Sequence, residues 1–251
     1  MNKMEQHQTA ALIIAIDGPS ASGKGTIARK LAAHFGLAHL DTGLLYRAVG
    51  MAVLRVGGDL SDAGLAEKAA LALAKGLTGS AVPDAASPST AFAAIDFPQL
   101  LAEEALRTDE AGVAASKVAV VPAVRAALLK FQKDFCATPA EGKKGSVLDG
   151  RDIGTVIAPN AQVKIFVTAS AEARAQRRFK ELQGRNQNAI YASVLMDMKE
   201  RDARDAERSL APTKPAPDAV MLDTTDLTAA QAFEEAVRIV RDRLPLVSVN
   251  H

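Results

Sequence analysis

The sequence has no tryptophan, only 4% aromatic residues and a single cysteine among its 251 residues. So few aromatic side chains speak against base stacking along a single nucleic-acid strand as the main activity. A lone cysteine, Cys136, excludes an internal disulfide, which suits a reducing cytoplasm. Because a helix is predicted over 125–135, beside this cysteine, we interpret Cys136 as structural and not as a nucleophile.

An excess of one charge and a long apolar run are also missing. Lys and Arg number 30 against 29 Asp and Glu, so no global field attracts nucleic acid or an anionic membrane. Residues 1–9 are polar, which predicts no signal peptide, and the apolar run 10–16 is too short to span a bilayer. We therefore expect a cytoplasmic protein with no nucleic-acid or membrane partner, a disordered tail over 1–10 and, since no apolar stripe stands out, a monomer.

Short apolar segments alternate with amphipathic ones along most of the chain. The predicted buried strands are 11–16, 37–40, 146–148, 163–167 and 219–222. The predicted helices between and after them are 24–35, 44–54 and 228–244, the last with a capping box of Thr228 and Gln231. This alternation predicts an α/β fold with a parallel sheet covered by helices on both faces.

The stretch 58–145 breaks the alternation. It contains a loop rich in Pro, Ser and Ala over 79–91, and its later half has a helical pattern. We interpret it as an insertion into an α/β core made of 11–57 and 146–251.

The strongest chemical signal is a glycine-rich segment between the first predicted strand and the first predicted helix. It consists of Gly18, Pro19, Ser20, Ala21, Ser22, Gly23, Lys24, Gly25 and Thr26. Glycines let the backbone curl so that N–H groups face phosphate oxygens, and the helix N-terminus adds partial positive charge. Lys24 can reach the β- and γ-phosphates of ATP, and Thr26 can help hold Mg²⁺, although Gly25 stands where the strict pattern has Ser or Thr. The alternative, a glycine-rich turn with a surface lysine, does not explain the flanking strand and helix.

Three further blocks follow the later strands or lie on a helix near one. They are Asp-Thr-Gly-Leu-Leu-Tyr-Arg at 41–47, Leu-Asp-Gly-Arg-Asp-Ile-Gly-Thr at 148–155, and Arg-Asp-Ala-Arg-Asp-Ala-Glu-Arg at 201–208 before Ala-Pro at 211–212. In this order the blocks resemble the bacterial cytidylate kinases, from about residue 13 to the C-terminal helix. Adenylate kinases share the Gly-Lys-Gly-Thr loop but carry Asp-Gly-Phe-Pro-Arg where this chain has Asp-Gly-Arg-Asp at 149–152.

The resemblance implies a P-loop kinase fold and an activity. The fold is a three-layer α/β sandwich with a five-stranded parallel sheet, an inserted domain at 58–145 that binds the nucleoside monophosphate, and a short lid at about 174–208. The activity is transfer of the γ-phosphoryl group of ATP to CMP or dCMP with Mg²⁺. Its partners would be these small nucleotides.

The charges of the third block support this reading independently. If 201–208 is helical, Arg204 and Arg208 form a like-charge pair four residues apart, which costs a few tenths of a kcal/mol and has no purpose on a solvated helix. We therefore predict anion binding for Arg208. Arg201 with Asp205 could instead be an ordinary surface ion pair. The same accumulation of arginines recurs at Arg174, Arg177 and Arg178.

The resemblance also implies roles for individual residues. The residues implied to be catalytic are Lys24, Arg151 and Arg208. The residues implied to bind ATP are the loop 18–26 with Arg174 and Arg178. The residues implied to grip the CMP phosphate are Thr42, Arg47, Arg151 and Arg208. The residues implied to read the cytosine are Ser116, Arg125 and Asp152. The residues implied to meet the ribose and neighbouring groups are Arg201 and Asp205. The residues implied to hold Mg²⁺ are Thr26 and, through water, Asp149.

Simpler readings remain for several of these residues. Asp149 could only cap a strand end, Ser116 could be a helix N-cap, Arg125 a surface residue, and Asp152 a partner for a neighbouring arginine. Two rival functions also remain: a kinase for AMP or UMP, and a nucleotide-dependent switch that hydrolyses ATP without a small acceptor. Arginines after several separate strands disfavour the switch, because a switch needs a single phosphate site.

The sequence departs from the family most clearly around 93–98. Such kinases usually carry an Asn-Gly-Glu-Asp-like hairpin there, whereas this chain has Ala-Ala-Ile-Asp-Phe-Pro. Pro98 cannot donate to a central β-ladder, so a different local fold is expected.

Overall fold

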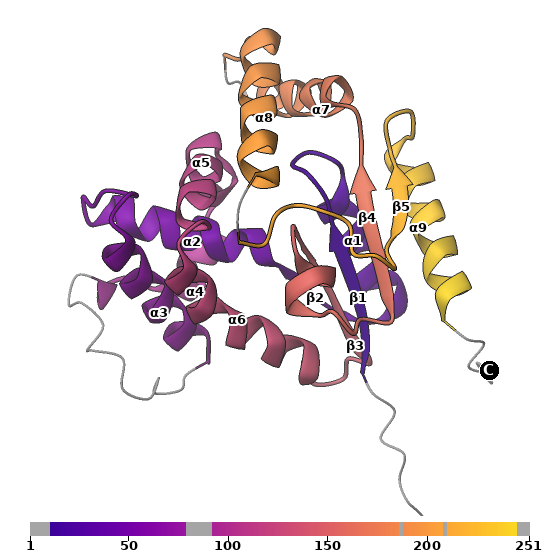
Figure 1. Ribbon diagram of the computed structural model, residues 1–251, viewed down its shortest axis with the longest axis horizontal. Helices are drawn as coiled ribbons and strands as arrows, with labels where there is room; N and C mark the ends of the chain where they lie inside the picture. The colour runs from indigo at the N-terminus through magenta and orange to yellow at the C-terminus, as the bar shows by residue number, and fades with distance from the viewer. Residues whose placement is uncertain (1–10, 79–91, 186–187, 208–209, 245–251) are drawn as a thin grey trace, which may run out of the picture.

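The protein is built on a five-stranded, all-parallel sheet. The computed structural model describes residues 11–78, 92–185, 188–207 and 210–244. The strands are β1 (Leu12–Asp17), β2 (Ala38–Asp41), β3 (Gly145–Gly150), β4 (Val163–Thr168) and β5 (Val220–Asp223). Their order is β2-β3-β1-β4-β5 (Figure 1). All five predicted strands are present, and the predicted fold class is confirmed.

Helices cover both faces of the sheet, as the continuous apolar strands require. On one face α1 (Lys24–Phe35) and α9 (Ala229–Arg243) pack on β1, β4 and β5 around a buried apolar cluster. On the other face α6 (Pro122–Ala137) and a π-helical turn, η3 (Ile153–Ile157), pack against β1 and β3. The three layers place the carboxyl ends of all strands at one edge, where open α/β sheets bind ligands.

A second apolar core lies beside the sheet, at the left of Figure 1, and is formed by helices. These are α2 (Thr42–Arg55), α3 (Ala63–Thr78), α4 (Phe97–Ala102), the 3₁₀ turn η2 (Glu104–Arg107), α5 (Asp109–Val118) and the start of α6. Two predicted helices are longer than expected: α2 starts at Thr42 instead of 44, and α6 spans Pro122–Ala137 instead of 125–135. Proline at the first turn of α6 explains its earlier start, since that turn needs no N–H.

The segment that departs from the family, 93–98, leads into a helix in this chain: α4 begins at Phe97. Asp96 caps α4, because its Oδ1 accepts the Gln99 N–H at 3.0 Å. Pro98 stands in the first turn of α4, where no backbone donor is needed. The residue that argued against a β-ladder therefore helps to begin a helix.

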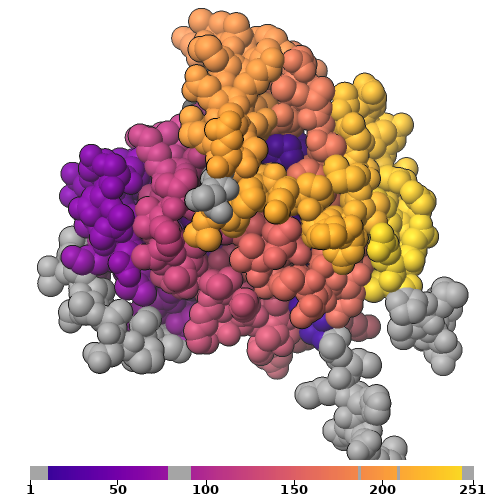
Figure 2. Space-filling model, viewed as in Figure 1, coloured from indigo at the N-terminus to yellow at the C-terminus, as the bar shows by residue number. Residues whose placement is uncertain are grey.

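Two helices stand over the carboxyl edge of the sheet. They are α7 (Ala171–Gly184) and α8 (Tyr191–Ala206), and α8 also contacts α5 (Figure 1). In the space-filling view, indigo atoms from the N-terminal part of the chain are seen in a hollow beneath these orange helices (Figure 2). Among the described residues, no single helix is long and apolar enough to cross a membrane; α5 and α6 together meet those limits, but they are bent by 102° relative to each other.

Candidate active site

The glycine-rich segment forms a tight loop between β1 and α1. Gly18 has φ 147°, and a Cβ at this position would lie 2.0 Å from the Val167 carbonyl oxygen, so only glycine fits. Gly23 is left-handed at the N-cap of α1, and Ala21 also has positive φ, at 55°. A loop with left-handed residues that opens a helix is the arrangement found in anion-binding nests.

Two side chains hold this loop from behind. Thr224 Oγ1 lies 2.9 Å from the Ser22 carbonyl oxygen, and Arg174 Nη1 donates to the Ser20 carbonyl oxygen at 3.3 Å. Arg174 is only 5% exposed and also pairs with Asp202 at 2.6 Å. Arg174, predicted to bind ATP, is therefore not on the wall of the cleft, and the contacts it makes are those of a support for the loop.

Lys24 lies at the bottom of the cleft, at the start of α1. Its Nζ donates to the Pro19 carbonyl oxygen at 3.1 Å. Burial, with the nearby charge of Arg151, lowers the pKa of Lys24 to about 7, although Asp149 and Asp41 act in the opposite direction. An amine enclosed in this way is stabilised in its charged form by an incoming anion.

Two carboxylates face the same region from neighbouring strands. Asp41 and Asp149 are paired in the β2–β3 register. Burial and then the Asp149 charge raise the pKa of Asp41, while Nε2 of His39 lies 2.8 Å from Oδ1 of Asp149. A pair of adjacent carboxylates is a donor set that suits Mg²⁺, which prefers oxygen ligands and takes one or two carboxylates beside substrate phosphates. Sequence reasoning assigned Asp149 to the metal but missed Asp41, although Asp41 also ends a predicted strand.

Arginines crowd the opposite wall. Arg47 donates from Nη1 to the Leu106 and Thr108 carbonyl oxygens at 2.7 and 3.2 Å. Burial lowers the pKa of Arg47, and Arg151 and Arg178 add to the effect. Guanidinium groups gathered in a partly buried space form a site for an anion.

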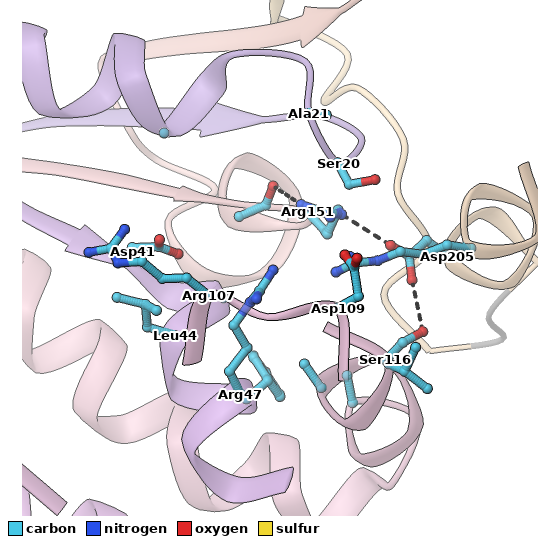
Figure 3. Close-up of a pocket in the computed structure, with 18 of the residues that line it drawn as sticks. Ser20, Ala21, Asp41, Leu44, Arg47, Arg107, Asp109, Ser116, Arg151 and Asp205 are labelled. Atoms are coloured by element: carbon cyan, nitrogen blue, oxygen red, sulfur yellow. Dashed lines mark hydrogen bonds and ion pairs between the residues drawn. The ribbon is translucent and has the colours of Figure 1, made fainter. Parts of the chain in front are cut away.

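One acidic residue of α8, Asp205, contacts Arg151 and Ser116 in the same part of the cleft. Arg151 Nε donates to Asp205 Oδ2 at 3.1 Å, and Ser116 Oγ lies 3.5 Å from Asp205 Oδ1 (Figure 3). Arg201 also lines the cleft, and a Cβ at Gly112 would lie 3.1 Å from its Nη1. The buried Asp205 therefore joins α8 to α5 and to the loop after β3.

Arg125 and Asp152 form an ion pair deep in the cleft. Their side chains are 11% and 6% exposed, and the Arg125 guanidinium lies 5.6 Å from the centre of the Tyr46 ring. The sequence placed both in a base-reading group on resemblance alone. The structure joins them directly, which matches both that role and the simpler reading in which Asp152 pairs with a neighbouring arginine.

Two arginines of the segment predicted to be a lid, Arg178 and Arg185, contact residues of α5 and η2. Arg178 donates from Nε and Nη2 to Asp109 Oδ1 at 3.1 and 2.5 Å, and it pairs with Glu181 at 2.8 Å. Arg185 Nη1 donates to the Arg107 carbonyl oxygen at 3.4 Å. Sequence reasoning missed Asp109 and Glu181, because a carboxylate on a helix gives no signal without its partner. The prediction for Arg208 lies outside the described residues.

These groups share one cleft of about 550 Å³. The predicted residues that line it are Ser20, Ala21, Lys24, Gly25, Thr42, Arg47, Ser116, Arg125, Asp149, Arg151, Asp152, Arg178, Arg201 and Asp205. The predicted residues that do not are Gly18, Pro19, Ser22, Gly23, Thr26 and Arg174. A phosphate loop at the edge of a parallel sheet, facing a second cluster of arginines, defines a P-loop phosphotransferase of the nucleoside monophosphate kinase class.

Comparison with known proteins makes the assignment specific. A family model described as cytidylate kinase matches residues 14–242. A relative named cytidylate kinase from Paramagnetospirillum magneticum is 56% identical over 91% of this chain and 97% of its own length. Those from Rhodospirillum rubrum and Methylocella silvestris are 52% and 51% identical, over 91% and 96% of this chain and 97% and 99% of their own lengths. The chain belongs to the cytidylate kinase family, as the resemblance predicted.

Proposed function

We propose that this protein transfers the γ-phosphoryl group of ATP to CMP and dCMP, which yields ADP with CDP or dCDP. The observation that carries the proposal is the single cleft in which a phosphate loop faces an arginine cluster and a buried Arg–Asp pair. Such a site has room for two anionic substrates. A nucleotide switch binds phosphate at one site only, so it does not account for the arginine cluster that faces the phosphate loop. Family membership favours cytidine monophosphates over AMP or UMP as the acceptor.

On the donor side, the loop 18–26 binds the phosphates of ATP. Backbone N–H groups and the start of α1 supply partial positive charge, and Lys24 reaches the transferring phosphoryl group. Arg178, on α7, also lines the cleft, and we assign it to the phosphates of ATP as well. Arg174 contributes by holding the Ser20 carbonyl, which keeps the loop in its binding conformation.

On the acceptor side, arginines hold the CMP phosphate in line with the ATP γ-phosphate. We assign this to Arg47, Arg151 and Arg208, with Thr42 nearby. The attacking atom is a phosphate oxygen that is already anionic near neutral pH, so no general base is needed. Catalysis then consists of alignment and charge stabilisation, which fixed guanidinium groups supply.

The nucleoside of CMP binds beside these acceptor-side arginines. Ser116, Arg125 and Asp152 recognise the cytosine, and Arg201 and Asp205 meet the ribose and neighbouring groups. Asp152 can accept from the exocyclic amino group of cytosine, as carboxylates do in base recognition elsewhere. Its ion pair with Arg125 holds the carboxylate in place before the base arrives.

The donor set at the ends of β2 and β3 fits a magnesium ion bound with ATP. Asp149, through water, and Asp41 would hold it; Thr26, which the resemblance also implied as a ligand, lies on α1 and does not line the cleft. When bound, Mg²⁺ neutralises charge on the phosphates during transfer.

We also propose a division of the chain into moving parts. Residues 58–145 would act as the domain that binds the monophosphate, and 174–208 as the lid; the apolar core of that domain also includes α2, which belongs to the 11–57 segment. The remainder of 11–57 and 146–251 is the core. Closure over both nucleotides would exclude water and prevent wasteful hydrolysis of ATP. We also propose a cytoplasmic location, where both nucleotides are found and where a free, buried cysteine such as Cys136 stays reduced. The oligomeric state that we propose is a monomer.

One coupled assay tests the function. ADP formation is measured with ATP, Mg²⁺ and, in turn, CMP, dCMP, UMP, AMP or no acceptor. We expect turnover with CMP and dCMP at a kcat/KM at least about 10-fold above that with UMP or AMP, which corresponds to about 1.4 kcal/mol. ADP formation that is independent of any acceptor would instead establish the ATPase, and a preference for AMP or UMP would reassign the substrate.

A further inference from the structure

Asp17 is a buried acid for which neither substrate site has a use. It is the last residue of β1, directly before Gly18, and it is 4% exposed. Its Oδ1 accepts the Ile153 N–H at 2.7 Å, and its Oδ2 accepts the Gly154 N–H at 2.8 Å. Both carboxylate oxygens are therefore committed to a single backbone turn, 136 residues further along the chain.

The position of that turn gives the contact its significance. The β1–β3 ladder ends where Asp17 pairs with Gly150, and Arg151 and Asp152 follow immediately outside the sheet. Backbone pairing can no longer hold the chain beyond this point. The Asp17 side chain continues the connection and fixes residues 153 and 154, directly after the two acceptor-side residues.

The turn is closely packed against this carboxylate. Ile153 is completely buried, and a Cβ at Gly154 would lie 3.4 Å from Asp17 Oδ2 and 3.1 Å from Lys164 Cδ. Little space is therefore left between the turn, the acid and the Lys164 side chain. The packing of the 153–154 turn therefore depends on its contact with Asp17 at the end of β1.

We propose that Asp17 is a positioning residue that fixes Arg151 and Asp152 relative to the phosphate loop, so that CMP is aligned with ATP. Asp17 itself contacts neither nucleotide in this scheme. The proposal rests on the proposed function, because it takes Arg151 and Asp152 as the residues that bind CMP. The donor loop has separate supports, Thr224 and Arg174, and so does not depend on the Asp17 carboxylate.

A carboxylate is the group best suited to this task. It presents two acceptor oxygens to two N–H groups, whereas an amide presents one acceptor and turns its NH₂ toward the other N–H. Burial raises the pKa of Asp17 to about 6, so the side chain is ionised at pH 8 and can accept both bonds. Asp17→Asn keeps the size of the side chain and removes one of the two bonds that it accepts from Ile153 and Gly154, which we call the clamp.

The test compares Asp17→Asn with Asp223→Asn at pH 8. Asp223 also ends a strand of the sheet and accepts two bonds from Thr225, at 2.8 and 2.6 Å, but it is exposed. For Asp17→Asn we expect the KM for CMP to rise about 10-fold, because the released turn must be ordered again when CMP binds, with the KM for ATP within about twofold of wild type. Asp223→Asn is expected to keep both KM values.

Different outcomes would contradict the role of Asp17 and the proposed function. If wild type phosphorylates CMP and Asp17→Asn retains the wild-type KM for CMP, the positioning role is wrong. A lower melting temperature with unchanged KM values, or an equal rise in both KM values, would make Asp17 a structural residue only. If the wild-type enzyme does not use CMP at all, the proposed function fails first.

A second measurement needs no variant. Hydrogen exchange of the wild-type protein reports on the Ile153 and Gly154 amides directly, and we expect them to be as protected as the amides of β3. Exchange at the rate of an open loop would overturn the clamp even if Asp17→Asn did not fold.

Discussion

Binding of ATP to Lys24 should take up a proton above neutral pH. Burial in the cleft lowers the pKa of Lys24 to about 7 in the empty enzyme. Phosphates beside the amine favour its charged form, so its pKa in the complex returns toward the ordinary lysine value. Since the bound state holds the proton more tightly than the free state, protons are absorbed wherever the free amine is neutral.

The size of the effect follows from that pKa. With a free pKa of about 7, the uptake on binding is about 0.9 proton at pH 8 and about 0.1 proton at pH 6. By the same linkage, the affinity for ATP should fall about 10-fold between pH 6 and pH 8. The sign is fixed: affinity decreases as the pH rises through the free pKa of Lys24.

Calorimetry measures the uptake directly. MgATP is titrated into enzyme without CMP, in buffers of different ionisation enthalpy, and the slope of the binding enthalpy gives the number of protons. Lys24→Arg is the matched control, because a guanidinium stays charged throughout and its slope should be near zero wherever binding persists. Tight binding of ATP to wild type at pH 8 without proton uptake would refute the argument from burial.

A second change at the same residue concerns turnover. Lys24→Met should lower kcat by about 10²-fold or more.

Three further predictions concern selectivity and stability. Asp152→Asn should reduce the preference for CMP over UMP by about 10-fold in kcat/KM, because an amide can donate to uracil; a general loss of activity with the preference intact would leave Asp152 as a loop support. Gly50→Ala should lower the free energy of unfolding by about 1–3 kcal/mol in urea titrations, because the new Cβ would lie 2.6 Å from that of Ala114. Asp218→Asn should lower the free energy of unfolding by about 1 kcal/mol or less and leave kcat unchanged, because Asp218 is 57% exposed and water screens its 2.8 Å pair with the buried Lys164; an unchanged urea midpoint would show that the pair adds nothing.

Local signals account for what the sequence alone predicted correctly. Continuous apolar runs such as 11–16 mark strands buried on both faces, and the spacing of Thr228 and Gln231 predicted the capping box that opens α9. The phosphate loop was also readable, because glycines, a lysine and a following helix are neighbours in the chain. These features depend on a few adjacent residues, so no tertiary information is needed to recognise them.

Resemblance added the family and the substrate, which no local pattern contains. It named Arg125 and Asp152 as readers of the base without showing that they are partners. It also grouped Arg174 with Arg178, although the structure buries the first behind the loop and places the second on the cleft wall.

Only the tertiary structure decided which distant groups meet. The contact of Asp17 with the 153–154 turn, the pairing of Asp41 with Asp149, and the bond from Arg178 to Asp109 all join segments that are far apart in the sequence. Such contacts depend on the order of strands in the sheet and on how α7 and α5 lie over its edge. A side chain's partner and its burial set its charge state and its role, and both are properties of the folded chain and not of the residue itself.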